Sequence, residues 1–391
     1  MSSSLTRART GARVVPVETT PTAPARLERP DLLELLEGVP DFRARRGVRH
    51  VLAVLLAVAL AAVLTGARSF VAIGEWATDT DPGVLERLGV KTARIPCEAT
   101  LRRAVTGADA AMLARVVGAF LFTRTATVAG RRVIAVDGKT VRGARAGAAA
   151  APHLVAAYDH DTGVVLGQLA VAAKSNEIPT VRDLLACFDL SGVVVTADAM
   201  HTQTGTADLI IAGGGHYVLQ VKANQKRLYQ ACKGLPWGDI PQVSSVATGH
   251  GRRTRRTIKA VATPGWVHFP HAAQVAQIRR TTTVKGRKRV EVVYVISSLP
   301  MDQAPPSVLA CWVQGHWGIE TALHWVRDVT YDEDRSQVRT GTAPETMATL
   351  RNIAISLLRL AGHANIAAAL RHHARHPDHA VDLILNPPER L

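Results

Sequence analysis

The chain has 391 residues, 47% of them hydrophobic, which is enough for sizeable cores in two or three domains. An excess of 47 Lys and Arg over 32 Asp and Glu gives a net charge of +15 at pH 7, so polyanions are the expected partners. Four scattered cysteines without a CxxC pair argue against a zinc site or a disulfide framework, and the longest apolar run, 51–64, is too short for a membrane span. We therefore expect a cytoplasmic globular protein without a membrane partner.

The N-terminal third predicts helices. Residues 1–30, rich in Arg, Ser, Thr and Pro, are expected to form a disordered basic arm. Capping residues and apolar spacing predict helices over 31–37, 50–64, 69–78 and 98–105. Together they indicate an all-helical domain over residues 31–128. Its last two helices are either a plain packing unit or a helix-turn-helix-like DNA reader that directs Thr100, Arg102 and Arg103 at phosphate.

From residue 129 the pattern changes to short apolar runs separated by turns, which is typical of a sheet with crossover helices. Strands are expected over 133–137, 154–158, 164–171, 193–198 and 217–221. Helices are expected over 180–188 and 207–212. This order predicts an α/β fold with an RNase H-like catalytic core, a mixed five-stranded sheet with flanking helices, within residues 129–391.

Three acidic residues occupy positions that suit phosphoryl transfer. Asp137 and Asp198 end predicted strands that are neighbours in this fold, and Glu320 lies in a helix expected over 316–327. Carboxylates in these settings can hold two divalent cations about 3.5–4 Å apart, which promotes in-line displacement at phosphate. A nucleic-acid backbone is the expected substrate. Rivals for the third acid lie beyond the helix face directed at the sheet and rank below Glu320; they are Asp328, Asp332, Glu333 and Asp334.

A strongly basic segment separates the second acid from the third. The spacing of 122 residues from Asp198 to Glu320 is too long for one loop, so we expect a β-rich insertion over about 226–300, with strands over 274–283 and 290–297. Residues 226–290 hold fourteen basic residues and one acid, a net charge of +13. This segment is either a solvated face or, as the density of charge favours, a phosphate track. Its candidate DNA-binding residues are Arg252, Arg253, Arg255, Arg256, Lys285, Arg287, Lys288 and Arg289.

Basic residues close to the acids are further candidates for DNA contact. Gly138 after Asp137 is expected to let the chain turn sharply at the strand end, which places Lys139 to touch a phosphate. His316, His324 and Arg327 recur at helical spacing around Glu320 and are predicted to share its helix face. Because hard cations prefer oxygen, the two histidines are expected to contact phosphate or to pack, and not to bind metal.

Four motifs resemble the ISAs1 family of bacterial insertion-sequence transposases, within the wider IS4-like DDE superfamily. They are Val-Asp-Gly-Lys-Thr-Val-Arg-Gly at 136–143, Lys-Ser-Asn-Glu-Ile at 174–178, Ala-Asp-Ala-Met-His-Thr-Gln at 197–203, and the segment from His-Trp-Gly-Ile-Glu at 316–320 to Trp325 and Val326. The segment from Val39 to Ala77 is similar to the associated domain that precedes this core. The resemblance thus covers nearly the whole chain.

The resemblance implies a DDE transposase with Asp137, Asp198 and Glu320 as catalytic metal ligands for Mg²⁺, with Mn²⁺ as an alternative. It implies hydrolysis at the terminal inverted repeats of an insertion sequence and strand transfer into target DNA, by a homodimer or larger synaptic assembly in the nucleoid. The third acid's surroundings depart from the Tyr, Arg, Glu, Lys signature of the wider relatives. This chain has Val313, His316, Glu320 and Arg327 at the matching spacing.

Two other functions stay open at this point. A decayed insertion-sequence copy with intact acids would be an inactive DNA-binding remnant. An RNase H-like nuclease would cut DNA without joining strands. Glu177 in the second motif is either an extra site acid or part of a structural loop.

Overall fold

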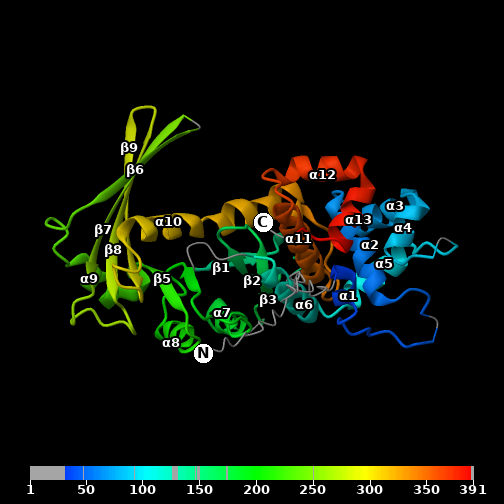
Figure 1. Ribbon diagram of the computed structural model, residues 1–391, viewed down its shortest axis with the longest axis horizontal. Coiled ribbons are helices and arrows are strands. Elements are labelled where there is room, and N and C mark those ends of the chain that lie inside the picture. The colour runs from blue at the N-terminus through cyan, green and yellow to red at the C-terminus, as the bar shows by residue number, and fades with distance from the viewer. Residues whose placement is uncertain are drawn as a thin grey trace, which may run out of the picture. The chain divides into compact units, whose positions relative to one another are not determined.

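One nine-stranded mixed sheet organises the chain (Figure 1). This computed structural model describes residues 31–388, apart from 47, 92, 126–130, 146, 148, 149, 173, 174 and 250; the basic arm expected over 1–30 lies outside them. The strands are β1 (Val133–Thr140), β2 (His153–Asp159), β3 (Val165–Ala170), β4 (Val194–Ala197), β5 (His216–Val221), β6 (Val243–Gly249), β7 (Arg252–Ala262), β8 (Gln274–Val284) and β9 (Arg287–Ser297). Their order in the sheet is β3-β2-β1-β4-β5-β9-β8-β7-β6.

The first five strands have the order predicted for an RNase H-like core. The strand β1 is central, antiparallel to β2 and parallel to β4, and β4 is in turn parallel to β5. Helices α7 (Glu177–Leu185) and α8 (Thr204–Ala212) connect the parallel strands. The expected fold class is confirmed, and all five expected strands are present.

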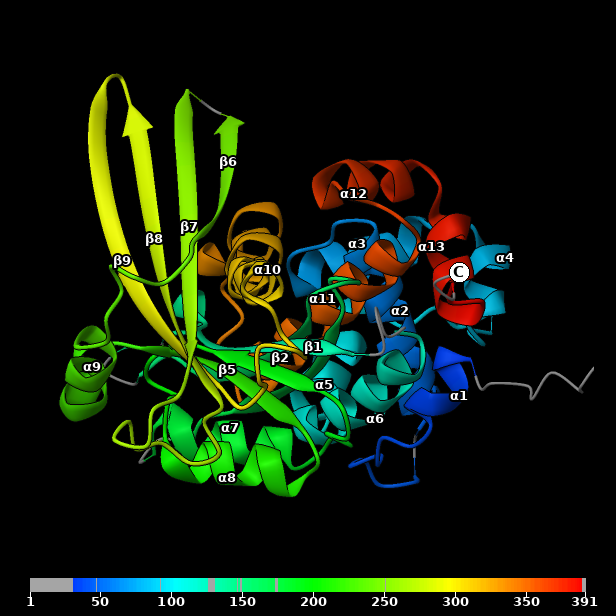
Figure 2. The same ribbon diagram turned by 60° about the vertical axis from the view of Figure 1, so that its left-hand side comes forward.

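The basic insertion extends this sheet and does not form a separate one. Its last strand, β9, pairs antiparallel with β5, so β6–β9 continue the core sheet (Figure 2). The strands expected over 274–283 and 290–297 correspond to β8 and β9, whereas β6 and β7 were not predicted. The turn between β8 and β9 places Lys285 and Gly286 at positive φ values of 45° and 77°, as a tight hairpin requires.

Six helices precede the sheet, and capping side chains begin several of them. They are α1 (Leu32–Leu36), α2 (Leu52–Leu64), α3 (Phe70–Asp79), α4 (Pro82–Arg87), α5 (Glu98–Gly107) and α6 (Ala110–Thr123). Asp31 and Ser69 accept hydrogen bonds from the Glu34 and Ala72 amides, as their expected capping roles require. The four helices expected here are present, with α4 and α6 in addition.

The apolar helix α2 is the core of the helical region. All thirteen of its residues are buried, because α1, α3, α5 and the C-terminal helices α11 (Ala343–Leu360) and α13 (Pro377–Leu385) pack around it. No single helix among the described residues is long and apolar enough to cross a membrane. By length and composition alone, α5 and α6 taken together could do so, and the two helices are bent by 84° relative to each other.

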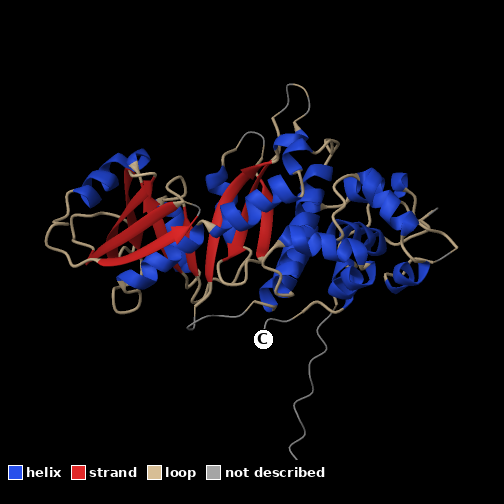
Figure 3. Cartoon of the chain, turned by 90° about the horizontal axis from the view of Figure 1, so that it is seen from above, coloured by secondary structure: helices blue, strands red, loops and turns tan. Residues whose placement is uncertain are grey.

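The helical region is joined to the sheet by packing. Helix α6 lies against β3, and α11 contacts α2, α6 and β3, so helices from the N-terminal and C-terminal parts of the chain pack together (Figure 1). Figure 3 shows a group of helices gathered at one end of the strands. Helix α12 (Ile366–Arg375) completes this end of the fold. On the opposite flank, α9 (Lys226–Lys233) packs against β9.

The helix that carries Glu320 differs from the prediction. Helix α10 (Pro306–His316) is followed by two wide π-helical turns, η3 (Ile319–His324) and η4 (Val326–Thr330), in which the Trp325 amide bonds to the Glu320 carbonyl. A π-helical turn holds more residues than the 3.6 of an α-helix. The predicted face is therefore broken: Glu320 is exposed, whereas Arg327 is fully buried.

The contact between α6 and β3 predicts the effect of Gly118→Ala. A Cβ atom at Gly118 would lie 2.1 Å from the Leu166 carbonyl oxygen, so α6 would have to move away from the sheet. We expect the free energy of unfolding to fall by about 1–3 kcal/mol, measured by chemical denaturation.

Gly205→Ala in α8 is the matched control for this substitution. Its new Cβ would meet only the flexible end of the Arg182 side chain, at 3.3 Å. Because alanine favours helices more than glycine does, we expect unchanged or slightly higher stability. Equal stability of the Gly118→Ala variant and the wild type would contradict the described packing.

Candidate active site

The central strand pairing brings two of the predicted acids together. Val136 on β1 is in register with Ala197 on the parallel strand β4, so Asp137 and Asp198 follow at the same level of the sheet. Asp198 comes directly after its strand, as predicted. Asp137 does not end its strand, because β1 continues to Thr140 and pairs with β2 throughout. The prediction of a sharp turn at Gly138 is thus wrong.

Gly138 is required for close approach instead. A Cβ atom there would lie 2.4 Å from Glu177 Oε2 and 2.6 Å from His153 Nε2. The side chains of β2 and α7 therefore press against the backbone next to Asp137. Any side chain at this position would push Glu177 away from the central strand.

The third acid approaches from the π-helical segment. The turn η3 packs against β1, and Glu320 is close enough to Asp198 and Asp137 to affect their electrostatics. Its carboxylate makes no hydrogen bond or ion pair with any described side chain. The rival acids all have cationic partners: Asp328 pairs with Lys139, Asp332 with Arg335, Glu333 with Arg327 and Arg351, and Asp334 with Arg142.

The three carboxylates form a region of uncompensated negative charge. Burial, followed by the charges of Asp198, Glu320 and Glu177, raises the pKa of Asp137 to about 7. Burial and the charge of Asp198 also raise the pKa of Glu320, against the opposing effect of Lys222. Such a site gains stability from a bound cation, which would relieve the repulsion.

The donor set fits a hard divalent cation. Carboxylate oxygens are the ligands that Mg²⁺ prefers, and Asp137, Asp198 and Glu320 supply them from three different elements. In the described part of the chain, no three His, Cys, Asp or Glu side chains are already arranged to hold an ion. The carboxylates would therefore have to converge when an ion binds.

Both predicted histidines lie beside the acids, His316 buried and His324 half-buried. His324 Nδ1 lies 3.6 Å from Asp137 Oδ2, and its Nε2 is buried without a hydrogen-bond partner in the described structure. His316 Nδ1 is 3.1 Å from the Thr196 hydroxyl on β4. Burial lowers the pKa of His324 to about 3 and that of His316 to about 4. Both rings are thus neutral at pH 7, in packing positions and not on an open phosphate-binding surface.

Lys139 and Arg327 are also held inside the protein. The Lys139 ammonium is 8% exposed and pairs with Asp328. Arg327 is fully buried, with Nη2 2.8 Å from Glu333 Oε1 and Nη1 3.1 Å from Gln168 Oε1. The structure therefore does not offer either cation to DNA as predicted, because each already has a carboxylate partner. Both tie the segment after Glu320 to the core.

The basic strands present two faces, because side chains alternate along a strand. We call the face with Arg252, Arg256 and Arg280 the site-side face; it lines a cleft of about 890 Å³ that also contains Lys222 and Trp317. Arg287 and Arg289 belong to this face by their pairing with β8. The opposite, far face carries Arg253, Arg255, Arg279 and Lys288, and Lys285 lies in the hairpin turn.

This cleft lies between the basic strands and the helical segment that carries Glu320. Trp317, 44% exposed, precedes Glu320 on the same helical segment, and Arg280 lies 6.0 Å from its ring centre. Lys222, which follows β5, lines the cleft and also acts on Glu320. The site-side face thus shares one cleft with Lys222 and with Trp317, a neighbour of Glu320, although none of the three acids is among the lining residues.

Two family matches cover most of the chain. Residues 129–357 match the family described as "Transposase DDE domain", and residues 33–121 match one described as "DDE_Tnp_1-associated". The chain belongs to the DDE transposase family. The first match spans both strand acids and Glu320.

Proteins similar to this transposase carry related names. "Putative transposase YncI" of Escherichia coli O157:H7 is 32% identical over 349 residues, 84% of this chain and 87% of that protein. "H repeat-associated putative transposase YhhI" of Escherichia coli K12 is 29% identical over 350 residues, 85% of this chain and 91% of that protein. A solved piggyBac transposase synaptic complex with hairpin DNA aligns over 92% of this chain and 82% of that one, with 11% identity. The TM-score of this alignment is 0.40.

Sequence reasoning gave too little weight to a cluster around Glu177 in this transposase. Its carboxylate lies 2.6 Å from His153 Nε2 and 3.2 Å from His201 Nε2, and so links α7, β2 and the loop after Asp198. Burial works against the charge, but hydrogen bonds from His201 and His153 hold the pKa of Glu177 below its usual value. The available signal was the Ser-Asn-Glu-Ile stretch at 175–178, in which Asn176 caps α7.

The raised pKa of Asp137 predicts a pH-dependent stability difference in the transposase. The folded protein keeps this proton up to about pH 7, whereas the unfolded chain loses it near pH 4. Wild-type stability therefore falls relative to Asp137→Asn as the pH rises from about 4 to 7, and the difference then levels off. We expect the variant to be more stable than the wild type at pH 8, by an amount on the order of a few kcal/mol.

Urea unfolding of both proteins between pH 5 and 8.5, without divalent cations, measures this difference. Asp239→Asn, in an exposed loop, is the control and should track the wild type. A stability difference between Asp137→Asn and the wild type that does not vary with pH would contradict the described electrostatics.

Proposed function

We propose that this chain is the DNA transposase of a bacterial insertion sequence of the ISAs1 type. It binds the ends of the element, hydrolyses a phosphodiester there, and joins the released 3′-hydroxyl to target DNA. The observation that carries this proposal is the meeting of Asp137, Asp198 and Glu320 from β1, β4 and η3, with pKa values raised at Asp137 and Glu320.

The proposed chemistry needs no covalent protein intermediate. Asp137 and Asp198 would hold divalent cations, Mg²⁺ or Mn²⁺, and Glu320 would complete the ligand set. Such ions supply activation of the attacking oxygen and stabilisation of the leaving oxygen. The protein's own contribution is to position the DNA backbone and to keep the carboxylates close together, which accounts for much of the rate in phosphoryl transfer.

The charge distribution supports a path for the DNA. The site-side face presents Arg252, Arg256 and Arg289, and Lys222 continues the positive charge toward Glu320. A duplex that follows this face enters the cleft beside Trp317 and reaches the acids. In this arrangement Lys222 would contact a phosphate near the scissile bond. Joining two element ends requires at least two protomers in the reacting assembly.

Asp137→Asn should abolish cleavage while end binding persists, because it removes a metal ligand without changing the basic faces. We expect strand cleavage to fall by at least about 10³-fold, on the scale of losing a main electrostatic contact in catalysis. Labelled element-end DNA, target plasmid and Mg²⁺ provide the assay, with gel-shift binding in parallel.

The outcomes of this assay with the wild type separate the possible functions. Cutting and joining support the transposase, and cutting alone supports a nuclease. Binding without reaction supports an inactive remnant. Wild-type cleavage by Asp137→Asn would refute the assigned site.

The two faces of the basic strands provide a matched pair of variants. Arg252→Gln with Arg256→Gln removes two charges from the site-side face, and Arg253→Gln with Arg255→Gln removes two from the far face. If the first pair contacts phosphate, the slope of log affinity against log salt should fall by about two. The far-face pair should change the slope little.

Binding of element-end duplex at several salt concentrations measures both slopes. Both variants carry the same net charge, so a difference between them reports position and not total charge. Equal slopes would show that the site-side face has no special part in binding.

A further inference from the structure

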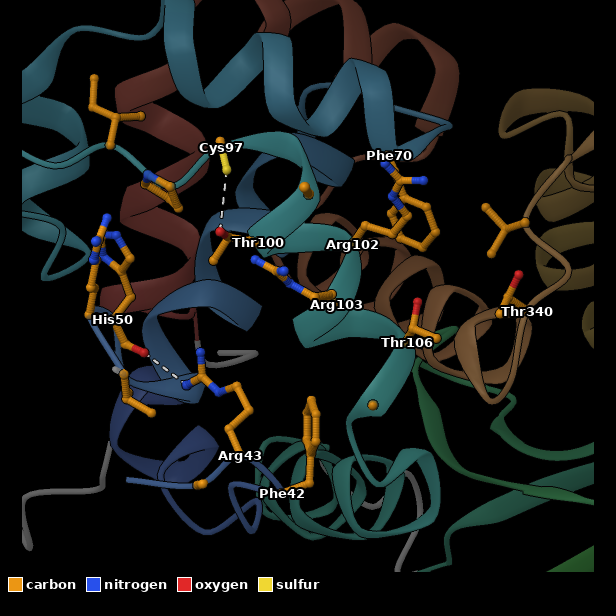
Figure 4. A pocket seen from close by; sticks show the side chains of 18 of the residues that line it. Phe42, Arg43, His50, Phe70, Cys97, Thr100, Arg102, Arg103, Thr106 and Thr340 are labelled. Carbon is orange, nitrogen blue, oxygen red and sulfur yellow. Dashed lines mark hydrogen bonds between the residues drawn. The ribbon is translucent and has the colours of Figure 1, made fainter. Parts of the chain in front are cut away.

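A second positively charged cleft lies in the helical region. It has a volume of about 1300 Å³ and is bounded by the loop 42–50, by α5 with the residues before it, and by the segment 337–340 (Figure 4). Figure 4 shows Arg43 and Arg103 extending into this space from different segments. We call it the arginine cleft. None of its lining residues belongs to the cleft beside Glu320.

The arginine cleft holds positive charge without matching negative charge. Arg46, Arg49, Arg94 and Arg103 line it, are exposed, and form no ion pair with any described acid. A cleft lined by charge of one sign focuses the electrostatic field and raises the local concentration of anions, including polyanions. Planar guanidinium groups are also suited to paired contacts with phosphate oxygens.

Two other arginines are held in place by acids at the edge. Arg43 makes bonds of 2.8 and 2.7 Å to Asp41 and a third, of 2.8 Å, to the His50 carbonyl. Arg102 lies 2.6 Å from Glu98 on the same helix. These pairs fix part of the wall, whereas the four unpaired arginines are not held by any described acid.

The titration of His50 is consistent with this concentration of charge. Burial lowers the pKa of His50, and the nearby charges of Arg43, Arg49 and Arg94 lower it further. The three guanidinium groups therefore act on one point of the cleft wall. No compensating acid is among the groups that act on His50.

The arginine cleft also joins the helical region to the catalytic sheet. Arg339 in its wall donates from Nε to the Gly143 carbonyl, 3.1 Å away, just after β1. The Thr342 hydroxyl bonds to the Thr106 carbonyl at the end of α5, at 2.8 Å. A ligand in the cleft would therefore contact the N-terminal helices and a segment anchored beside the strand of Asp137.

We propose that the arginine cleft binds the sugar-phosphate backbone of duplex DNA, as a second DNA site separate from the cleft at Glu320. The proposal rests on the proposed function, since it takes the substrate to be DNA. The volume exceeds the several hundred Å³ typical of a small-molecule pocket. The wall is rich in arginine, as expected for a phosphate backbone that supplies regularly spaced charge.

Two sources of duplex share this chemistry, the element end and target DNA. The two bind differently in one respect: an element end is recognised by sequence, whereas a target backbone is bound without regard to it. Duplexes with and without the terminal repeat therefore distinguish the two sources within one experiment.

The free cysteines allow a direct test in the otherwise unaltered chain. Cys97 lines the arginine cleft, Cys311 lines the cleft beside Glu320, and Cys187 lines neither. All three are exposed, and a hydrogen bond from Thr100 lowers the pKa of Cys97, which favours thiol labelling. Maleimide labelling of Asp137→Asn protein, read by mass spectrometry at each cysteine, reports which cleft DNA covers.

We expect saturating duplex to slow labelling of Cys97 at least fivefold and to leave Cys187 unchanged. Protection by the terminal-repeat duplex alone assigns the cleft to element ends, and equal protection by a scrambled duplex assigns it to target DNA. Unchanged Cys97 with protected Cys311 would overturn the second site while leaving the proposed function intact. Protection of neither cysteine would overturn the inference, and active cleavage in the parallel assay would then show that the proposed function survives.

A pair of charge variants provides an independent measurement. Arg94→Gln with Arg103→Gln should weaken binding of the assigned duplex about tenfold or more and lower the salt slope by about two. Arg371→Gln with Arg375→Gln, exposed on α12, removes the same charge elsewhere and should bind as the wild type does. All four positions are exposed, so both variants should keep wild-type thermal stability. Equal binding by both variants would overturn the proposal.

Discussion

The parallel pairing of β1 with β4 is the constraint on which the site depends. Its register sets Val136 beside Ala197 and thereby places Asp137 and Asp198 at one level of the sheet. Their mutual repulsion and the burial of Asp137 lower the free energy of unfolding when the carboxylates are ionised. Gly138 and the Glu177 cluster surround this point closely, so the strand cannot relax away from it. Such a site is a place where stability and function oppose each other.

A buried ion network holds the third acid's segment in position. Arg327 and Arg351 both bond to Glu333, with distances of 2.8 and 2.9 Å, and all three are buried between the π-helical turns and α11. Removing one partner would leave an uncompensated buried charge, which is strongly destabilising. The network therefore anchors the chain after Glu320, while the wide turns of η3 leave Glu320 itself free of partners among the described residues. A rigid buried ion network and the unpaired carboxylate of Glu320 therefore lie within a few residues of each other.

The sheet also relates the acids to the basic surfaces. Because β9 pairs with β5, four strands continue the sheet that carries Asp137 and Asp198, and three of them, β7, β8 and β9, are rich in arginine. The two faces of these strands differ only by the alternation of side chains. The segment 337–340 links the helical region to the end of β1 in a similar way, through Arg339 and Gly143. The basic strands and the segment 337–340 are thus each attached to the core sheet, the first by strand pairing and the second by a side-chain to backbone hydrogen bond.

Sequence by itself determined the fold class and many of the elements, and it predicted the three acids, since alternation and capping residues are local signals. Asp31 and Ser69 cap their helices as expected, and the strand order places Asp137 at the centre.

Tertiary structure decided which cationic side chains remain available to contact DNA. Lys139 and Arg327 are predicted from the sequence to contact phosphate, but in the structure they form ion pairs with Asp328 and Glu333. These pairs depend on the π-helical turns, which place Asp328 and Arg327 differently from the predicted α-helix. The division of the arginines between two faces likewise follows from the register of the sheet. Gly138 is predicted from the sequence to form a turn, whereas in the structure it allows Glu177, from another element, to approach the backbone closely. Pairing between distant residues depends on packing that no local pattern encodes.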